Sequence, residues 1–276
     1  MGALPEEACL GDAGSVVRFV IVSYPRSGTH LLRTSLESHP AVVCQAEPFN
    51  SDDRRLPYPL ATPTADVLSG WVFRDDVPDT VRAVGFVLQA YHPHALEAFP
   101  GIRPNPGWAD VWPRLAAMDG LRVVHLERRN LLARHLSHRM ARATGAWHAW
   151  DPAAVDGVTH LTGRPPEGQI GRPQGERPRL TIDPAQLALD FEEVARWRRH
   201  AEEALAGRPL LRLTYEELCG DSAATAARVQ AFLGLEPRPL RPAVAKLEER
   251  PPERAIENYA ELKSHFAGSP WESFFV

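Results

Sequence analysis

The sequence predicts an α/β fold of three layers, in which helices cover both faces of a central parallel sheet. Two observations lead to this prediction. Short runs of apolar and β-branched residues alternate along the chain with longer segments of helical periodicity. The first such run, Val16–Ser23 (VVRFVIVS), is apolar almost throughout, which is typical of a strand buried on both faces of a parallel sheet.

A loop with one glycine, YPRSGTH, follows the first strand and leads into a helix. Leu32 and Leu36 lie four residues apart on one face of this helix, and Pro40 limits its length. Residues 50–80 are rich in Asp, Pro and Arg and lack periodicity, so we expect mostly loop there with a short helix. The run Val81–Tyr91 alternates in the manner of a second strand.

The middle of the chain repeats the order of strand, loop and helix. Leu121–Leu126 (LRVVHL) predicts a third strand, which leads through ERRN into a helix from Leu131 to about Ala143. Residues 144–180 are rich in Gly and Pro, and we expect no regular structure there. A long irregular segment in a compact domain is usually a functional lid or is disordered, and the sequence leaves both open.

The last part of the predicted sheet and its helices have clear end signals. A long helix is predicted over Asp183–Ala206, with Asp183 as its N-cap and Pro184 at its first position. A short strand at Leu210–Leu213 and a helix at Ser222–Leu233 follow, and Gly234 ends that helix.

Length and composition indicate one globular domain over residues 16–276, preceded by a short extension, 1–15. The extension lacks the basic and apolar regions of a signal peptide, and no apolar run reaches the roughly 18 residues of a membrane span. A net charge of −4 speaks against a nucleic-acid binder. The three cysteines form neither a disulfide framework nor a zinc motif, so we expect a cytoplasmic protein. The sequence does not indicate its oligomeric state.

The loop at residues 25–30 has the properties of an anion site. Backbone N–H groups at a helix start favour an anion, Gly28 permits close approach, and Arg26 adds a permanent charge. Ser27 and Thr29 contribute hydroxyl groups. The loop is not a Walker A motif, which requires GxxxxGK[ST]. Taken alone, it could equally be an ordinary strand-to-helix turn.

Three segments resemble, in order, the motifs of sulfotransferases that use 3′-phosphoadenosine 5′-phosphosulfate (PAPS). FVIVSYPRSGTHLLRTSL resembles the first cofactor loop, and VVHLERRNLLARHLSHRMA resembles the second, whose Arg and Ser lie eight positions apart. LTYEELCGDSAATAARVQAFLGL resembles a late strand and helix of the family. The closest branch is the bacterial carbohydrate type, which modifies trehalose or nodulation oligosaccharides. VRAVGFVLQAYH and IENYAELKSHFAGSPWESFF also resemble that branch.

The resemblance implies a P-loop-like strand, loop and helix that binds the phosphosulfate, with 3′-phosphoadenosine 5′-phosphate (PAP) as product. It implies that Arg129 and Ser137 hold the 3′-phosphate and that Tyr215 lies near adenine, although Tyr215 could equally close a strand end. The 5′ side would be held by the first loop, whose residues are Arg26, Ser27, Gly28, Thr29 and His30.

The acceptor hydroxyl needs a general base, and the resemblance points to Glu47 in CQAEPF. His92, in QAYHPH, is the reserve candidate, because other members of the family use a histidine. Arg26 would stabilise charge on the leaving group but cannot donate a proton. We expect no metal requirement. The pairs His135/His138 and His92/His94 have spacings that suit metal ligands, but no third ligand accompanies either pair.

The sequence therefore predicts a sulfotransferase that acts on a hydroxyl of a carbohydrate, glycolipid or secondary metabolite. Two other functions stay open: a nucleoside or small-molecule kinase with a related loop, and a non-catalytic nucleotide-binding module. The kinase would need a P-loop lysine, which this loop lacks. Four tryptophans could stack on sugar rings or could merely anchor loops; they are Trp108, Trp112, Trp147 and Trp150.

Overall fold

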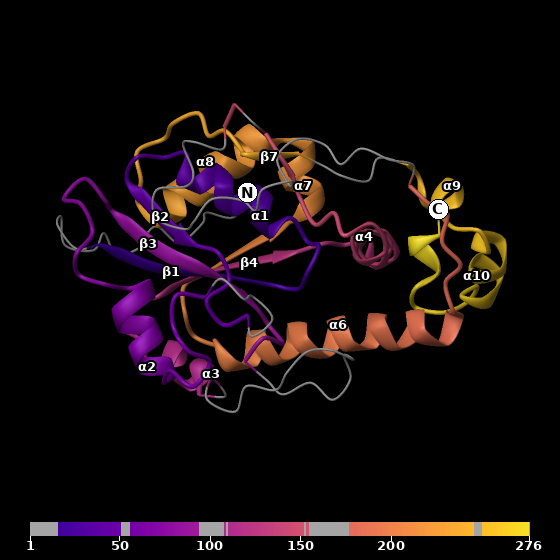
Figure 1. Cartoon of the computed structure of the whole chain (residues 1–276), viewed down its shortest axis with the longest axis horizontal. Coiled ribbons are helices and arrows are strands. Elements are labelled where there is room, and N and C mark those ends of the chain that lie inside the picture. Colours follow the sequence, from indigo (N-terminus) through magenta and orange to yellow (C-terminus); the bar gives the residue numbers. More distant parts are fainter. Residues whose placement is uncertain are drawn as a thin grey trace, which may run out of the picture.

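A central sheet of five parallel strands organises the molecule, in the order β2-β3-β1-β4-β6 (Figure 1). The computed structural model describes residues 16–50, 56–93, 108, 110–151, 153–154, 177–245 and 250–275. The strand bounds are β1, Val17–Ser23; β2, Val42–Gln45; β3, Ala83–Gln89; β4, Arg122–Glu127; and β6, Leu210–Thr214. The predicted three-layer α/β fold is confirmed.

Successive residues of β1 serve opposite faces of the sheet, as the period of a strand requires. Val20 and Val22 belong to one apolar cluster, and Phe19 and Ile21 belong to the other. All four are at most 1% exposed, which explains why this strand is apolar throughout. Figure 1 shows one group of helices above the sheet and one below it, with the helices of residues 131–144 and 252–265 to the side.

The helices of one face are α1 (Thr29–Glu37), α7 (Tyr215–Gly220) and α8 (Ser222–Leu233), whose leucines and valine pack on Phe19 and Ile21. The other face is covered by three helices and a π-helical turn. These are α2 (Thr64–Val67), the turn Leu68–Val72, α3 (Val111–Ala116) and α6 (Pro184–Ala204).

A third apolar cluster joins the C-terminal segment to α4 (Leu131–Thr144) and α6. Phe191 of α6 lies within 5.3–5.7 Å, between ring centres, of Phe266, Trp271 and Phe274. The aromatic end of the sequence therefore packs as core. The remaining elements are α9 (Pro252–Ala255), α10 (Tyr259–His265), a 3-10 turn (Glu272–Phe274), and the strands β5 (Ala149–Trp150) and β7 (Val244–Ala245), which pair antiparallel.

Most predicted element ends agree with the structure. Asp183 caps α6 and Pro184 begins it, and Gly234 ends α8 in the left-handed conformation (φ 70°). The second strand is shorter than predicted, because the chain turns after Gln89, so Tyr91 lies outside it. The prediction that residues 121–126 form a strand is correct to within one residue.

Several sequence predictions lie on residues outside the described ranges. They include the extension 1–15 and most of the segment 144–180, so the choice between a lid and disorder stays open. The described part of that segment contains strand β5, so the expectation of no regular structure is wrong there, because pairing with β7 makes those two residues regular. The single domain over 16–276 also stays a prediction. Within the described ranges, no helix is long and apolar enough to cross a membrane.

Candidate active site

The loop between β1 and α1 has the backbone of an anion cradle. Arg26 is the only non-glycine residue with positive φ (70°) in the described part of the chain, and Gly28 has φ 93°. A Cβ on Gly28 would lie 2.7 Å from the ring of Tyr215, so only glycine fits here. No side chain caps the N-terminus of α1, and its first turn holds no acidic residue. Its N–H groups thus fit a phosphosulfate or phosphate.

Arg26 joins this loop to α4. Its Nε donates to Oγ of Ser137 (3.1 Å), and another guanidinium nitrogen donates to the carbonyl of Trp147 (2.8 Å). Burial, followed by the neighbouring charge of Arg128, lowers the pKa of Arg26 to about 10. Arg26 thus remains protonated at neutral pH. The structure brings together one predicted residue from each of the two cofactor motifs.

Arg129 does not contact Ser137 in the way that Arg26 does. The Arg129 side chain is 66% exposed, and its Nε lies 3.7 Å from the carboxylate of Glu216. The backbone N–H groups of Arg129 and Asn130 also donate to that carboxylate, at 3.1 and 3.3 Å. Glu216 therefore holds the turn that begins α4. Ser137, by contrast, is buried and faces Arg26.

Arg128, which the sequence analysis did not single out, faces the cradle. Its guanidinium lies 4.3 Å above the ring of Tyr215 and donates to the carbonyl of Arg26 at 3.3 Å. Burial lowers the pKa of Arg128. Burial also raises the pKa of Tyr215 to about 12, so its ring remains a neutral phenol. The motif ERRN contains both arginines, and the sequence alone could not show which one turns inward.

Arg134 supports the loop from behind. It is 1% exposed, donates to the carbonyl of Pro25 (3.3 Å) and forms an ion pair with Asp190 of α6. Nδ1 of His135 lies 3.0 Å from the same carboxylate oxygen of Asp190. Burial by itself would raise the pKa of Asp190, but His135 and Arg134 lower it to about 2. A chain of polar contacts therefore runs from α6 through α4 to the loop.

Glu47 lies next to the cradle, at the carboxyl end of β2. Its Oε1 accepts from Nε2 of Gln89 (2.8 Å) and lies 3.8 Å from Nε2 of His30. Its Oε2 accepts from the amide of Asn50 (2.9 Å). The Gln89 amide also donates to Oγ1 of Thr29 (3.3 Å). The Glu47 side chain remains 17% exposed, so an incoming hydroxyl can reach it.

His92, the reserve base, is buried. Its ring packs against Tyr91 at 4.7 Å, and its backbone N–H donates to the carbonyl of Gln89. Tyr91 in turn packs against Tyr24 at 5.5 Å. These contacts belong to the turn that follows β3.

Aromatic rings gather beside Glu47. The rings of His30 and His148 lie 4.0 Å apart, and Trp150 lies edge-on to both, at 6.3 and 5.8 Å. Trp147 comes directly before His148 and is 37% exposed. Trp108 and Trp112, by contrast, are buried in the core, so they anchor the fold. Trp150 is buried as well, at 6% exposed, so among these four tryptophans sugar stacking is open only to Trp147.

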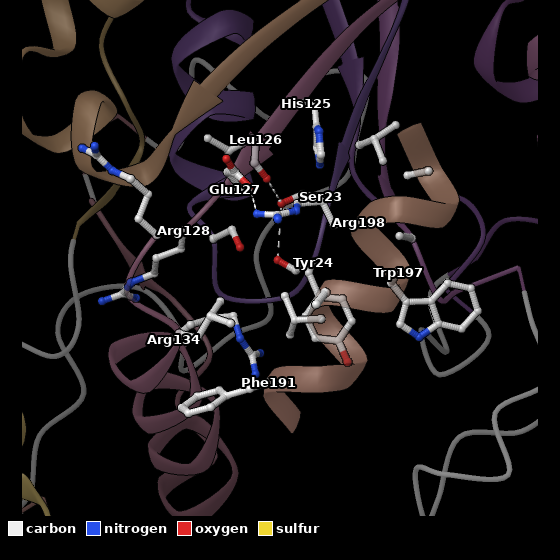
Figure 2. A pocket seen from close by; sticks show the side chains of 18 of the residues that line it. Ser23, Tyr24, His125, Leu126, Glu127, Arg128, Arg134, Phe191, Trp197 and Arg198 are labelled. Carbon is white, nitrogen blue, oxygen red and sulfur yellow. Dashed lines mark hydrogen bonds and ion pairs between the residues drawn. The ribbon is translucent and has the colours of Figure 1, made fainter. Parts of the chain in front are cut away.

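A cavity of about 270 Å³ lies on the α6 side of the loop, at the ends of β1 and β4 (Figure 2). Ser27 and Arg129 are among the residues that line it. Figure 2 shows cationic side chains from three elements around it: Arg128 after β4, Arg134 from α4 and Arg198 from α6. Arg198 is paired with Glu127 at 3.0 Å. The surplus of arginine makes this flank of the loop favourable to anions.

The histidine pairs behave differently from metal ligands. His135 bonds Asp190, and His138 packs against Trp147 at 5.8 Å. His94 lies outside the described residues. In the described ranges, no group of three or more His, Cys, Asp or Glu residues could hold a metal ion.

Comparisons with known proteins add a second line of evidence. No family model matches the chain. Nodulation protein H of Rhizobium tropici is 26% identical over 268 residues, which cover 93% of this chain and 92% of that protein. Nodulation protein H of Rhizobium meliloti (strain 1021) is 26% identical over 263 residues, which cover 93% of this chain and 94% of that protein.

Two solved structures are similar to this chain. A sulfotransferase from Alicyclobacillus acidocaldarius has a TM-score of 0.48 and 16% identity, with 92% of each chain covered. A mouse sulfotransferase complexed with PAP has a TM-score of 0.36 and 15% identity, with 90% of this chain and 66% of that chain covered.

The anion cradle on a parallel sheet and the similarity over most of the chain agree on one class, that of a PAPS-dependent sulfotransferase. Its homologues within that class are the rhizobial nodulation proteins H.

Proposed function

We propose that this protein transfers the sulfuryl group of PAPS to a hydroxyl of a carbohydrate, with Glu47 as the general base. The observation that carries the proposal is the contact between the carboxylate and the anion cradle. His30 of the cradle lies 3.8 Å from Glu47, and Gln89 bonds both Glu47 and Thr29. A base beside an anion site is the arrangement that in-line group transfer to a hydroxyl requires.

The cradle residues fit the cofactor that the class uses. The N–H groups at the start of α1, together with Ser27, Thr29 and His30, would hold the phosphosulfate at Gly28. Ser137 and the exposed side chain of Arg129 would hold the 3′-phosphate, and Tyr215 would lie near adenine. Bound PAPS supplies the sulfuryl group and yields PAP.

Two side chains would act on the reacting atoms. Glu47 would take the proton from the acceptor hydroxyl while the oxygen of that hydroxyl attacks sulfur. Arg26, protonated and half-buried beside Ser137, would stabilise the negative charge that develops on the leaving phosphate oxygen. No proton is needed from Arg26, since its guanidinium acts by charge and hydrogen bonding.

The aromatic rings beside Glu47 favour a carbohydrate acceptor. His30, His148 and Trp150 form one cluster, and Trp147 is exposed next to it. Aromatic faces pack well on the apolar faces of sugar rings. The relatives named nodulation protein H agree with the carbohydrate branch that the motifs resemble.

The alternative functions receive less support. A kinase would need a lysine in the loop, and the loop carries Arg26 instead. A non-catalytic module would not need a carboxylate beside the cradle, yet Glu47 lies 3.8 Å from His30 in the loop that carries Arg26. Catalysis is therefore the better explanation of the geometry.

Mass spectrometry of acceptors tests this proposal. The protein is incubated with PAPS and a panel of trehalose, other disaccharides, short oligosaccharides and simple phenols. We expect a gain of one SO₃ on a carbohydrate and release of an equal amount of PAP. Sulfation of the phenols alone would contradict the carbohydrate acceptor. Transfer of phosphate from ATP, with no transfer from PAPS, would contradict the reaction.

A further inference from the structure

We propose that Gln89 is a positioning residue for sulfuryl transfer, because its side-chain amide holds the Glu47 carboxylate beside the anion cradle. The inference rests on the proposed function, in which Glu47 is the base. Gln89 is the last residue of β3 and is 2% exposed. None of the sequence motifs assigns it a role.

The hydrogen bonds of Gln89 connect the two halves of the site. Its Nε2 lies 2.8 Å from Oε1 of Glu47 and 3.3 Å from Oγ1 of Thr29. An amide NH₂ group carries two hydrogens, one for each of these acceptors. The shorter contact is the one to the carboxylate, where the acceptor is charged and the bond is stronger.

The surroundings of Gln89 would otherwise favour an apolar side chain. The sequence of β3 is AVGFVLQ, in which Gln89 is the only polar residue, and the whole strand is buried. Oε1 of Gln89 is buried and has no hydrogen-bond partner in the described part of the chain. A buried amide carbonyl without a partner destabilises the fold, so packing alone does not explain glutamine here. The bond to Glu47 does explain it.

Glu47 also determines which way the amide faces. Only an N–H can lie against a carboxylate oxygen, so the nitrogen of Gln89 must point toward Glu47. With Gln89 on Oε1 and Asn50 on Oε2, the plane of the carboxylate is held from both sides. Each oxygen retains a second lone pair for the acceptor hydroxyl. Pre-orientation of this kind accelerates the step that follows binding.

Two substitutions test the role. Gln89→Met keeps the length of the side chain but removes both donors, and Gln89→Glu replaces a donor with an acceptor that repels Glu47. The readout is the rate of PAP release from PAPS, with the acceptor returned by the mass-spectrometric screen and with water alone as acceptor. We expect kcat to fall by about 10- to 100-fold in both variants, since misplacement of a reacting group has this effect.

The same variants should retain the cofactor site. We expect the KM for PAPS, and the affinity for PAP by calorimetry, to stay within about threefold of wild type, because the cradle backbone is untouched. Gln45→Met is the matched control, since Gln45 ends the neighbouring strand β2. It should leave kcat unchanged. If Gln89→Met does not fold, the kcat of the nearly isosteric Gln89→Glu variant tests the inference.

A double-mutant cycle separates this inference from the proposed base. If Gln89 acts through Glu47, adding Gln89→Met to Glu47→Gln should slow the enzyme by less than about threefold. A slow Glu47→Gln enzyme, combined with wild-type rates in both Gln89 variants, would overturn the inference alone. Effects that multiply in the double mutant would overturn it too. Wild-type rates in Glu47→Gln would instead overturn the proposed base.

Discussion

The carboxylate of Asp190 on α6 pairs with the guanidinium of Arg134 on α4, and Arg134 donates in turn to the carbonyl of Pro25 in the anion cradle. The Arg134 side chain is 1% exposed and that of Asp190 is 11% exposed. Loss of one partner would leave a buried charge next to the loop. The pair therefore links the stability of the helical layer to the shape of the cofactor site.

Asp190→Asn should destabilise the protein by about 3–5 kcal/mol at neutral pH, as is usual when one partner of a buried pair is removed. Because the folded protein holds the pKa of Asp190 at about 2, below the unfolded value, its contribution is present above about pH 4. It disappears as the pH falls through about 2. Urea unfolding at pH 7, 4 and 2.5 measures this difference. Glu192→Gln, an exposed change on the same helix, should have little effect at any of these pH values.

Arg26→Ala should reduce turnover more than it weakens PAP binding. Arg26 would act on charge that develops in the transition state, and loss of one such donor typically costs about 10²–10³ in kcat. Steady-state rates and calorimetry with PAP measure the two effects. Ser137→Ala removes one of the two hydrogen-bond partners of Arg26 and keeps the charge of Arg26, so the loss of kcat in this variant should be smaller. Wild-type turnover in Arg26→Ala would contradict the assignment of Arg26 to the leaving group.

PAP should bind more tightly than ADP, because PAP carries a 3′-phosphate. A hydrogen bond to a charged group contributes about 1.5–3 kcal/mol, which corresponds to roughly 10- to 150-fold in affinity. Calorimetry with both nucleotides measures the ratio. Arg129→Ala and Ser137→Ala should each lower the PAP affinity and leave the ADP affinity unchanged. Equal affinities for PAP and ADP in the wild type would contradict the assignment of these two residues to the 3′-phosphate.

His138 should make stability depend on pH between about 4 and 6.5. Burial, and then the charge of Arg134, lowers its pKa to about 4 in the folded protein. The unfolded chain therefore binds more protons in this window, and the free energy of unfolding rises with pH until about 6.5. His138→Gln should flatten that slope in urea unfolding at pH 4.5, 5.5 and 7. His265→Gln, at an exposed position on α10, serves as control. An unchanged slope in His138→Gln would contradict the prediction.

The sequence predicted the elements whose own residues carry the signal. β1 is apolar because both of its faces are buried, and α6 begins where Asp183 and Pro184 indicate. It missed β2, a four-residue strand that lacks a long apolar run and becomes regular only by pairing with β3. It also missed α3, where Pro113 reads as a helix breaker but lies in the first turn, which tolerates proline.

The sequence predicted which loops form the site, but it did not predict which way their side chains point. The motifs indicated that the segments of Arg26 and Ser137 belong to one site, and the two side chains do meet. Which arginine of ERRN faces the loop depends on backbone angles, and Arg128 faces inward. Gln89 was missed because the predicted strand ran on to Tyr91, so Gln89 looked like its interior and not its end.

The most direct test of the central claim compares Glu47→Gln with His92→Asn in the rate of sulfuryl transfer from PAPS. We predict that Glu47→Gln loses about 10²–10⁴ in kcat, the usual effect of removing a general base, with PAP affinity unchanged. His92→Asn should keep turnover within a few-fold of wild type, since the His92 ring packs against Tyr91 in the turn after β3. Normal turnover in Glu47→Gln together with a dead His92→Asn enzyme would contradict the account and assign the base to His92.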